Sequence, residues 1–153
     1  MFPGVNASPL LTAEDVERTS VPGKQVELVR GRLVVREPPG TWHGAIAARL
    51  TCLLGDFVHA RGLGVVFAQD TGFQIASDPD TVRAPDVAFV ARERADRIPR
   101  RGYAVVAPDL LAEGVEVRVY RQDGSLSVLH ASDSLEGEDV LPGFACPLMQ
   151  VLL

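Results

Sequence analysis

The sequence predicts an α+β fold: a mixed β-sheet flanked by one long helix and preceded by an N-terminal hairpin. Three observations predict it. Two short runs rich in Val and Leu are separated only by Arg30 and Gly31, as in a β-hairpin. A long stretch then places apolar residues at every third or fourth position, as in an amphipathic helix. After it come several short runs of β-type residues broken by turn residues, which indicate the strands of the sheet.

Length and composition favour one globular domain. The chain has 153 residues, of which 46% are hydrophobic and 23% charged, so we expect a single domain over residues 1–153 with a loose tail over 1–11. No apolar run is long enough to span a membrane, and the N-terminus lacks the pattern of a secretory signal. Cys52 and Cys146 are too few for a disulfide framework and should be reduced and mostly buried. A cytoplasmic protein is therefore expected.

The N-terminal half divides into four predicted elements. Thr12 and Asp15 form a capping-box pattern that opens a short helix. Gly62 ends the long helix, which should bury an apolar stripe. The expected elements are a helix over Ala13–Arg18, strands over Gln25–Val29 and Arg32–Arg36, and a helix over Thr41–Ala60 with Ile46, Leu50, Leu53, Leu54 and Phe57 in its stripe.

The C-terminal half reads mainly as strands. The one beginning at Asp86 is continuously apolar after that residue, which predicts a central position in the sheet. Residues 122–124 are expected to form a hairpin turn and residues 132–139 a solvated acidic loop. The expected elements are strands over Val65–Ala68, Thr71–Ala76, Asp86–Val90, Asp109–Glu113, Val115–Arg121 and Leu126–His130, one helical turn over Glu93–Asp96, and a helix over Pro147–Leu152.

Two acidic residues stand at strand ends. Asp86 follows Pro85 at the start of one predicted strand, and Glu113 ends another. If these strands are neighbours, the carboxylates can share one Mg²⁺ or Mn²⁺ ion within about 6 Å of each other. Such an ion polarises a phosphoryl oxygen and lowers the pKa of a bound water. The pair therefore favours phosphodiester hydrolysis, although Asp86 alone could also cap a turn.

An ordered set of motifs surrounds this pair. VELVRGRLVV begins at Val26, APDVAFVARER at Ala84, APDLLAE at Ala107, VEVRVYRQDG at Val115 and LPGF at Leu141. Together they resemble the Uma-type endonucleases of the PD-(D/E)XK restriction-endonuclease-like superfamily, over about residues 24–150. The resemblance implies a restriction-endonuclease-like fold and Mg²⁺-dependent cleavage of DNA, with Asp86 and Glu113 as metal ligands and Glu27 and His43 as further site residues.

The chain departs from that family after the second acid. The family has a helix with a catalytic lysine there, whereas Glu113 runs through Gly114 directly into the next strand. The only lysine is Lys24, far upstream, and Arg118 and Arg121 are the only basic residues close after Glu113. We therefore expect cleavage to be weak or lost. The alternatives are an inactive binding or assembly module derived from the nuclease fold, or a structural interaction domain in which the acid pair is accidental.

The shortening also predicts self-association. Removing a helix and a strand from a sheet would uncover apolar surface and an open strand edge. The polar residues 132–139 and the short last helix offer no obvious substitute. A homodimer would cover this surface.

Other polar and aromatic residues have two interpretations. His43 lies in line with the helix stripe, so it is either a hydrogen-bonded core histidine or a site residue. Glu27 is either on a solvated strand face or near the cation. Trp42 and Phe57 are expected to pack rather than to stack on nucleotides. His59 and His130 should be surface residues, and so should the acids Glu136, Glu138 and Asp139.

Net charge is −5, which argues against a broad DNA-binding face. Arginines nevertheless gather within a few positions at Arg92, Arg94, Arg97, Arg100 and Arg101. They form either a solvated loop and short helix or a patch that faces phosphates.

Overall fold

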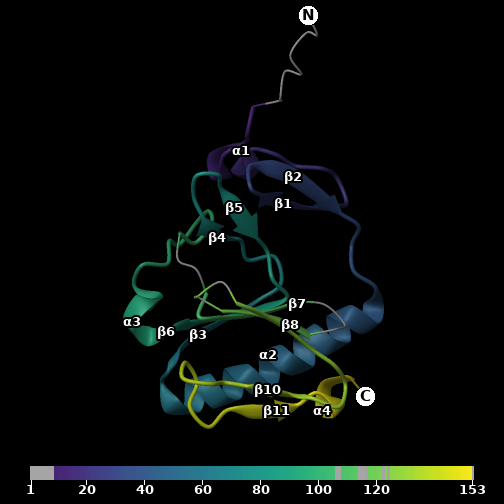
Figure 1. Cartoon of the computed structure of the whole chain (residues 1–153), viewed down its shortest axis with the longest axis vertical. Coiled ribbons are helices and arrows are strands. Elements are labelled where there is room, and N and C mark those ends of the chain that lie inside the picture. The colour runs from purple at the N-terminus through teal and green to yellow at the C-terminus, as the bar shows by residue number, and fades with distance from the viewer. Residues whose placement is uncertain (1–8, 106–107, 114–116, 122, 124, 153) are drawn as a thin grey trace, which may run out of the picture.

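The computed structural model describes residues 9–105, 108–113, 117–121, 123 and 125–152, with backbone only for residues 110–113. The predicted tail lies mostly outside these residues, and so do positions 122 and 124 of the predicted turn. Figure 1 shows the layers of the molecule: a small sheet with α1 at the top, a larger sheet across the middle, and α2 with the C-terminal elements below. The predicted α+β class is confirmed.

The small sheet is built from the predicted hairpin and two strands that follow the long helix. Its order is β2 (Arg32–Arg36), β1 (Gln25–Val29), β5 (Thr81–Arg83) and β4 (Phe73–Ala76). The hairpin has the predicted bounds because Arg30 and Gly31 both adopt positive φ, as a tight two-residue turn requires. Helix α1 (Ala13–Glu17) opens with the predicted capping box and packs Val16 against Leu28 and Val82. Strand β5 was not predicted, since three residues carry too short a pattern.

The larger sheet has five strands. Their order is β3 (Gly64–Ala68), β6 (Val87–Ala91), β7 (Leu110–Glu113), β8 (Val117–Arg121) and β9 (Leu126–Leu129), and neighbouring strands are antiparallel. A parallel bridge joins Phe73 to Ala104 outside these strands. Strand β6 is buried on both faces, as its continuous apolar run predicts. The short helix α3 (Arg92–Ala95) follows it.

Helix α2 (Thr41–Arg61) covers one face of the five-stranded sheet. Gly62 ends it in the left-handed conformation at φ 61°, as predicted. Its buried residues are Ile46, Ala47, Leu50, Leu54 and Val58, so the predicted stripe is largely confirmed. The prediction for Leu53 is wrong, because that residue lies beside the buried row and is 40% exposed. Within the described part of the chain no helix is long and apolar enough to cross a membrane.

The C-terminal segment covers more of the core than predicted. Strand β10 (Ser134–Glu136) pairs with β11 (Ala145–Pro147), and helix α4 (Met149–Leu152) follows. The expected solvated loop over residues 132–139 is wrong because Leu135 is only 1% exposed and joins the core beneath the sheet. The last helix starts at Met149 because Pro147 pairs with Ser134. This segment supplies the cover that the sequence alone did not reveal.

Candidate functional site

The site is organised by the alternation of β6. Val87 and Phe89 join the core formed with α2, whereas Ala88 and Val90 pack in a separate cluster on the other face, with Phe73 and Ala104. Asp86 lies directly before this strand, which begins at Val87, one residue after its predicted start. A buried, doubly covered strand therefore fixes the backbone that carries Asp86.

Asp86 and His43 meet although they are distant in the sequence. The Nε2 atom of His43 lies 2.7 Å from Oδ1 of Asp86, within hydrogen-bonding distance, and the side chains are 17% and 18% exposed. His43 lies in the first turn of α2, so the helix start brings its ring to the β6 start. His43 therefore has a carboxylate partner, which both of its interpretations allow, and its role as a site residue stays a prediction.

Glu27 forms a buried clamp on the segment before Asp86. Its side chain is 3% exposed, and its Oε1 accepts hydrogen bonds from Nε of Arg83 at 3.1 Å and from the amide of Ala84 at 3.0 Å. The Nε atom of Arg36 lies 3.0 Å from Oε2 of Glu27. This contact is an ion pair whose angles do not make it a hydrogen bond. The solvated-face interpretation of Glu27 is therefore wrong, because arginines from both flanking strands converge on it.

Arg83 is a residue that the sequence analysis missed. Besides the contact with Glu27, its guanidinium carbon lies 5.7 Å from the centroid of the Tyr120 ring. Arg83 therefore links the small sheet to β8 of the large one. The available signal was a charged residue in a Thr-Val-Arg run three positions before Asp86.

The register of the large sheet brings the backbone positions of the two acids together. Val87 is paired with Ala112 across β6 and β7, and the next step of that antiparallel ladder places Glu113 opposite Asp86. Glu113 is in turn paired with Arg118 across β7 and β8. The predicted neighbouring strands are confirmed. The side chain of Glu113 lies outside the described residues, and so does the predicted distance between the carboxylates.

The basic residues near the site differ in their partners. Lys24 forms an ion pair with Glu37 at the open end of the hairpin. Arg121 binds both carboxylate oxygens of Glu138, at 2.7 and 2.6 Å, and this hydrogen bonding lowers the pKa of Glu138. Arg118 is exposed, and no described residue pairs with its guanidinium. Of the two arginines that closely follow Glu113, Arg118 is therefore the one without a side-chain partner among the described residues.

The packing predicted for two aromatic residues is correct for one and wrong for the other. Phe57 packs edge to face on Phe144, with ring centroids 5.2 Å apart, as expected. The prediction that Trp42 packs is wrong, because its side chain is 74% exposed at the start of α2. His59 and His130 are exposed as predicted.

The arginines of the run after β6 differ in their contacts. Arg94 forms an ion pair with the buried Asp109 at 2.6 Å, and Arg92 contacts the carbonyl of Gly62 at 3.5 Å. Arg97, Arg100 and Arg101 are exposed. Part of the run is therefore structural. Among the described residues no three His, Cys, Asp or Glu side chains gather as a metal cluster.

Comparison with known proteins supports the fold. The chain is similar to a crystal structure titled "a putative nuclease belonging to DUF820" from Anabaena variabilis ATCC 29413, with a TM-score of 0.67 and 15% identity over 93% of this chain and 97% of that one. At this identity the likeness concerns the fold. No curated protein matches.

A family profile gives the stronger result. Residues 13–115, more than half of the chain, match Uma2, described as "Putative restriction endonuclease". The matched region includes Glu27, His43, Asp86 and Glu113 and ends before Arg118. On the extent of this match, the chain belongs to the Uma2 family of restriction-endonuclease-like proteins.

Proposed function

We propose that this protein binds a divalent cation, Mg²⁺ or Mn²⁺, through Asp86 and Glu113, acts on DNA, and cleaves it weakly or not at all. The observation that carries the proposal is the position of Asp86. It contacts His43 at 2.7 Å and lies opposite the backbone of Glu113 when the β6–β7 register is continued.

The donor set fits such an ion. Carboxylate oxygens are the ligands that Mg²⁺ prefers, and one or two of them are enough because the ion keeps several waters. Opposite residues in an antiparallel pair have Cα atoms about 4.5–5.5 Å apart, which allows two carboxylates to share an ion. When bound, the ion would polarise a phosphoryl oxygen and lower the pKa of a bound water.

Glu27 and His43 act as positioning residues in this proposal. Glu27 holds Arg83 and the Ala84 amide, and therefore fixes the short segment that ends at Asp86. His43 restrains the Asp86 carboxylate by contacting Oδ1. Such restraint matters because partners around a metal ligand change metal affinity by about 10–100-fold.

Arg118 is the basic residue that we place beside this site. It is paired with Glu113 in the β7–β8 register, and no described side chain competes for it. A guanidinium can bind phosphate oxygens with two hydrogen bonds. It also remains protonated, so it is a poor source of a proton for the leaving group. Arg118 therefore supports DNA binding better than it supports fast cleavage.

Cleavage of supercoiled plasmid tests the proposal. We expect trace nicking, stronger with Mn²⁺ than with Mg²⁺, that disappears in Asp86→Ala and persists in the exposed control Asp139→Ala. Robust nicking by Asp86→Ala would contradict the assignment of the site. Cation binding and DNA binding without any nicking would favour the second candidate, an inactive binding or assembly module, which the absence of a lysine after Glu113 supports.

We also propose that the protein is a cytoplasmic homodimer. The sequence predicted a dimer because apolar sheet surface would be uncovered. The structure weakens this reason, because residues of the C-terminal segment cover much of that surface. The remaining support is an exposed surface on α2. The two cysteines are free, which fits a reducing compartment. The expectation that both are mostly buried is correct for Cys146 and wrong for Cys52, which is exposed.

A further inference from the structure

Helix α2 presents a straight row of exposed residues on the side away from the sheet. Trp42, Ala45, Arg49, Cys52 and Asp56 follow one another at alternating spacings of three and four, so they lie along one line of the helix. All five are exposed, and Trp42 is 74% exposed. We call this row the α2 ridge.

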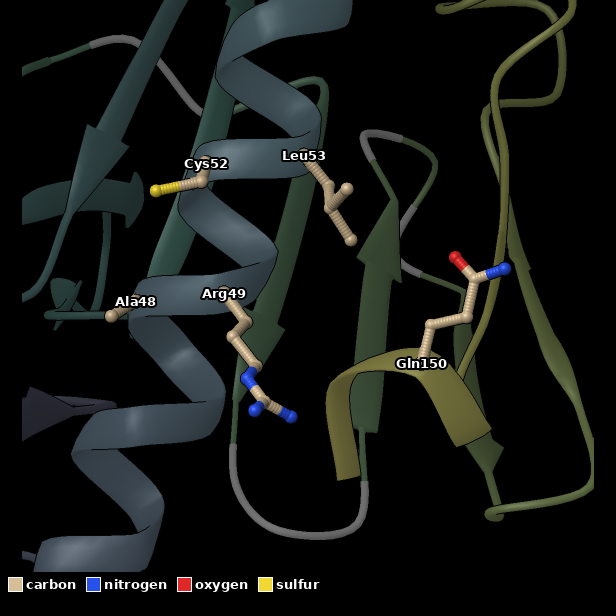
Figure 2. A pocket seen from close by; sticks show the side chains of 5 residues that line it. All are labelled: Ala48, Arg49, Cys52, Leu53 and Gln150. Atoms are coloured by element: carbon tan, nitrogen blue, oxygen red, sulfur yellow. The ribbon is translucent and has the colours of Figure 1, made fainter. Parts of the chain in front are cut away.

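Hollows lie on both sides of the α2 ridge. One of about 440 Å³ is lined by Ala48, Arg49, Cys52, Leu53 and Gln150, and one of about 330 Å³ lies between α2 and the end of β3. Figure 2 shows Arg49 and Leu53 pointing toward the side of Gln150 and Cys52 pointing to the opposite side of the helix. Leu53 is 40% exposed and Met149 of α4 is 50% exposed. The ridge therefore stands between shallow, mostly apolar depressions that a second helix can enter.

The α2 ridge carries one positive and one negative side chain at equal distances from its middle. Arg49 and Asp56 are exposed, and no described residue pairs with either side chain. They are two helical turns apart, about 10 Å along the axis. In two antiparallel copies of α2, Arg49 of one copy lies opposite Asp56 of the other, and the symmetric pair forms at the same time. The midpoint between Arg49 and Asp56 falls between Cys52 and Leu53.

We propose that two copies of this chain dimerise through the α2 ridge, with the helices antiparallel about a two-fold axis near Cys52 and Leu53. A second copy is the occupant because the surface is complementary to itself in charge, as a two-fold interface requires. A parallel pairing would instead place Arg49 against Arg49. The small side chains of Ala45, Ala48 and Cys52 let two helices approach closely. The inference specifies the surface of the proposed homodimer and does not depend on cation or DNA binding.

Charge reversal tests the arrangement. Sedimentation velocity over a concentration series should show a dimer that is weakened about tenfold or more by Arg49→Asp or by Asp56→Arg, because each change breaks two symmetric pairs and creates repulsion. The double variant, with both changes, should regain the dimer. Arg97→Asp and Asp139→Arg carry the same charge changes at exposed positions off the ridge and should leave dimerisation unchanged.

Cross-linking locates the two-fold axis. A short bis-maleimide should join two chains through Cys52, and Cys52→Ser should abolish the product. Cys146 is 2% exposed, and burial raises the pKa of its thiol, so it should not react. Circular dichroism confirms that each variant folds. A monomer at all concentrations would overturn the inference. A dimer that ignores both single reversals and gives no Cys52 product would also overturn it, and neither outcome bears on the plasmid assay.

Discussion

The two faces of the five-stranded sheet are covered by different chemistry. Toward α2, Val87 and Phe89 of β6 and Val119 of β8 meet a continuous apolar core. On the other face, Ala88 and Val90 pack in a small cluster, and the neighbouring contacts include the Glu27–Arg83 pair and the Arg83–Tyr120 contact. The face toward α2 therefore carries the larger apolar core, whereas charged groups are held beside the other face. Substitutions toward α2 should change stability alone, whereas substitutions on the other face should also change cation or DNA binding.

The largest effect is expected on the α2 face. Leu54 is 0% exposed, and Leu54→Ala should lower the free energy of unfolding by about 2–5 kcal/mol through lost burial and a residual cavity. Urea denaturation measures this. The neighbouring Leu53→Ala serves as the control, because Leu53 is 40% exposed and should cost far less. Equal losses for both leucines would mean that the face assignment of α2 is incorrect.

Glu27 gives the largest expected effect on the charged face. Glu27→Ala removes a buried carboxylate that accepts hydrogen bonds from Arg83 and from the Ala84 amide, and it should destabilise the fold by about 3 kcal/mol. It should also weaken Mn²⁺ binding, since the segment before Asp86 loses its clamp. Denaturation and calorimetry of the same samples check both effects. Normal Mn²⁺ affinity in a destabilised variant would reduce Glu27 to a purely structural role.

A smaller effect with a defined pH dependence is expected at Glu138. Hydrogen bonding to Arg121 lowers the pKa of this carboxyl, so the pair stabilises the fold above the ordinary pKa of a glutamate and the gain is lost as pH falls through the lowered value. Because the Glu138 side chain is 46% exposed, the gain at neutral pH should be at most about 1 kcal/mol. Glu138→Gln should therefore differ from the unmodified protein at pH 7 and approach it in acid. A difference that persists in acid would show that the pair is not its source.

Arg118 should affect stability least. It is exposed and without a described partner, so Arg118→Ala should change the free energy of unfolding by no more than about 0.5 kcal/mol. It should nevertheless weaken DNA binding and reduce the dependence of that binding on salt, as loss of a phosphate contact does. Arg97→Ala provides an exposed control. DNA binding with the same affinity and salt dependence in both variants would remove Arg118 from the site.

Short sequence patterns predicted the elements that form through contacts within one stretch of the chain. The hairpin was predicted to the residue because a two-residue turn sets its register, and α2 was predicted because its stripe and Gly62 lie within one stretch. Strands β5, β10 and β11 were missed because each has only three residues. Strand β5 forms by pairing with β1, which is distant in the sequence, and β10 and β11 form by pairing with each other. Their formation depends on tertiary contacts that no short window of sequence contains.

The candidate site was predictable to a similar degree. The motif positions proposed Asp86 and Glu113, and the ordered family resemblance predicted that β6 and β7 are neighbours, which their pairing confirms. The burial of Glu27 was open in the sequence, because it depends on Arg36 and Arg83 arriving from opposite sides of β1. Arg83 itself was overlooked for the same reason. The alternation of residues along a strand did not show whether Glu27 and Arg83 are buried, because their burial depends on contacts between strands that are distant in the sequence.

The central claim is that Asp86 and Glu113 together hold a divalent cation on the charged face of the sheet. Calorimetric titration with Mn²⁺ tests it without requiring cleavage. We predict one Mn²⁺ bound per chain, with affinity reduced at least about tenfold in Asp86→Asn and in Glu113→Gln, and unchanged in the exposed control Asp139→Asn. Failure of the folded protein to bind Mn²⁺, or equal binding by all four proteins, would contradict the claim.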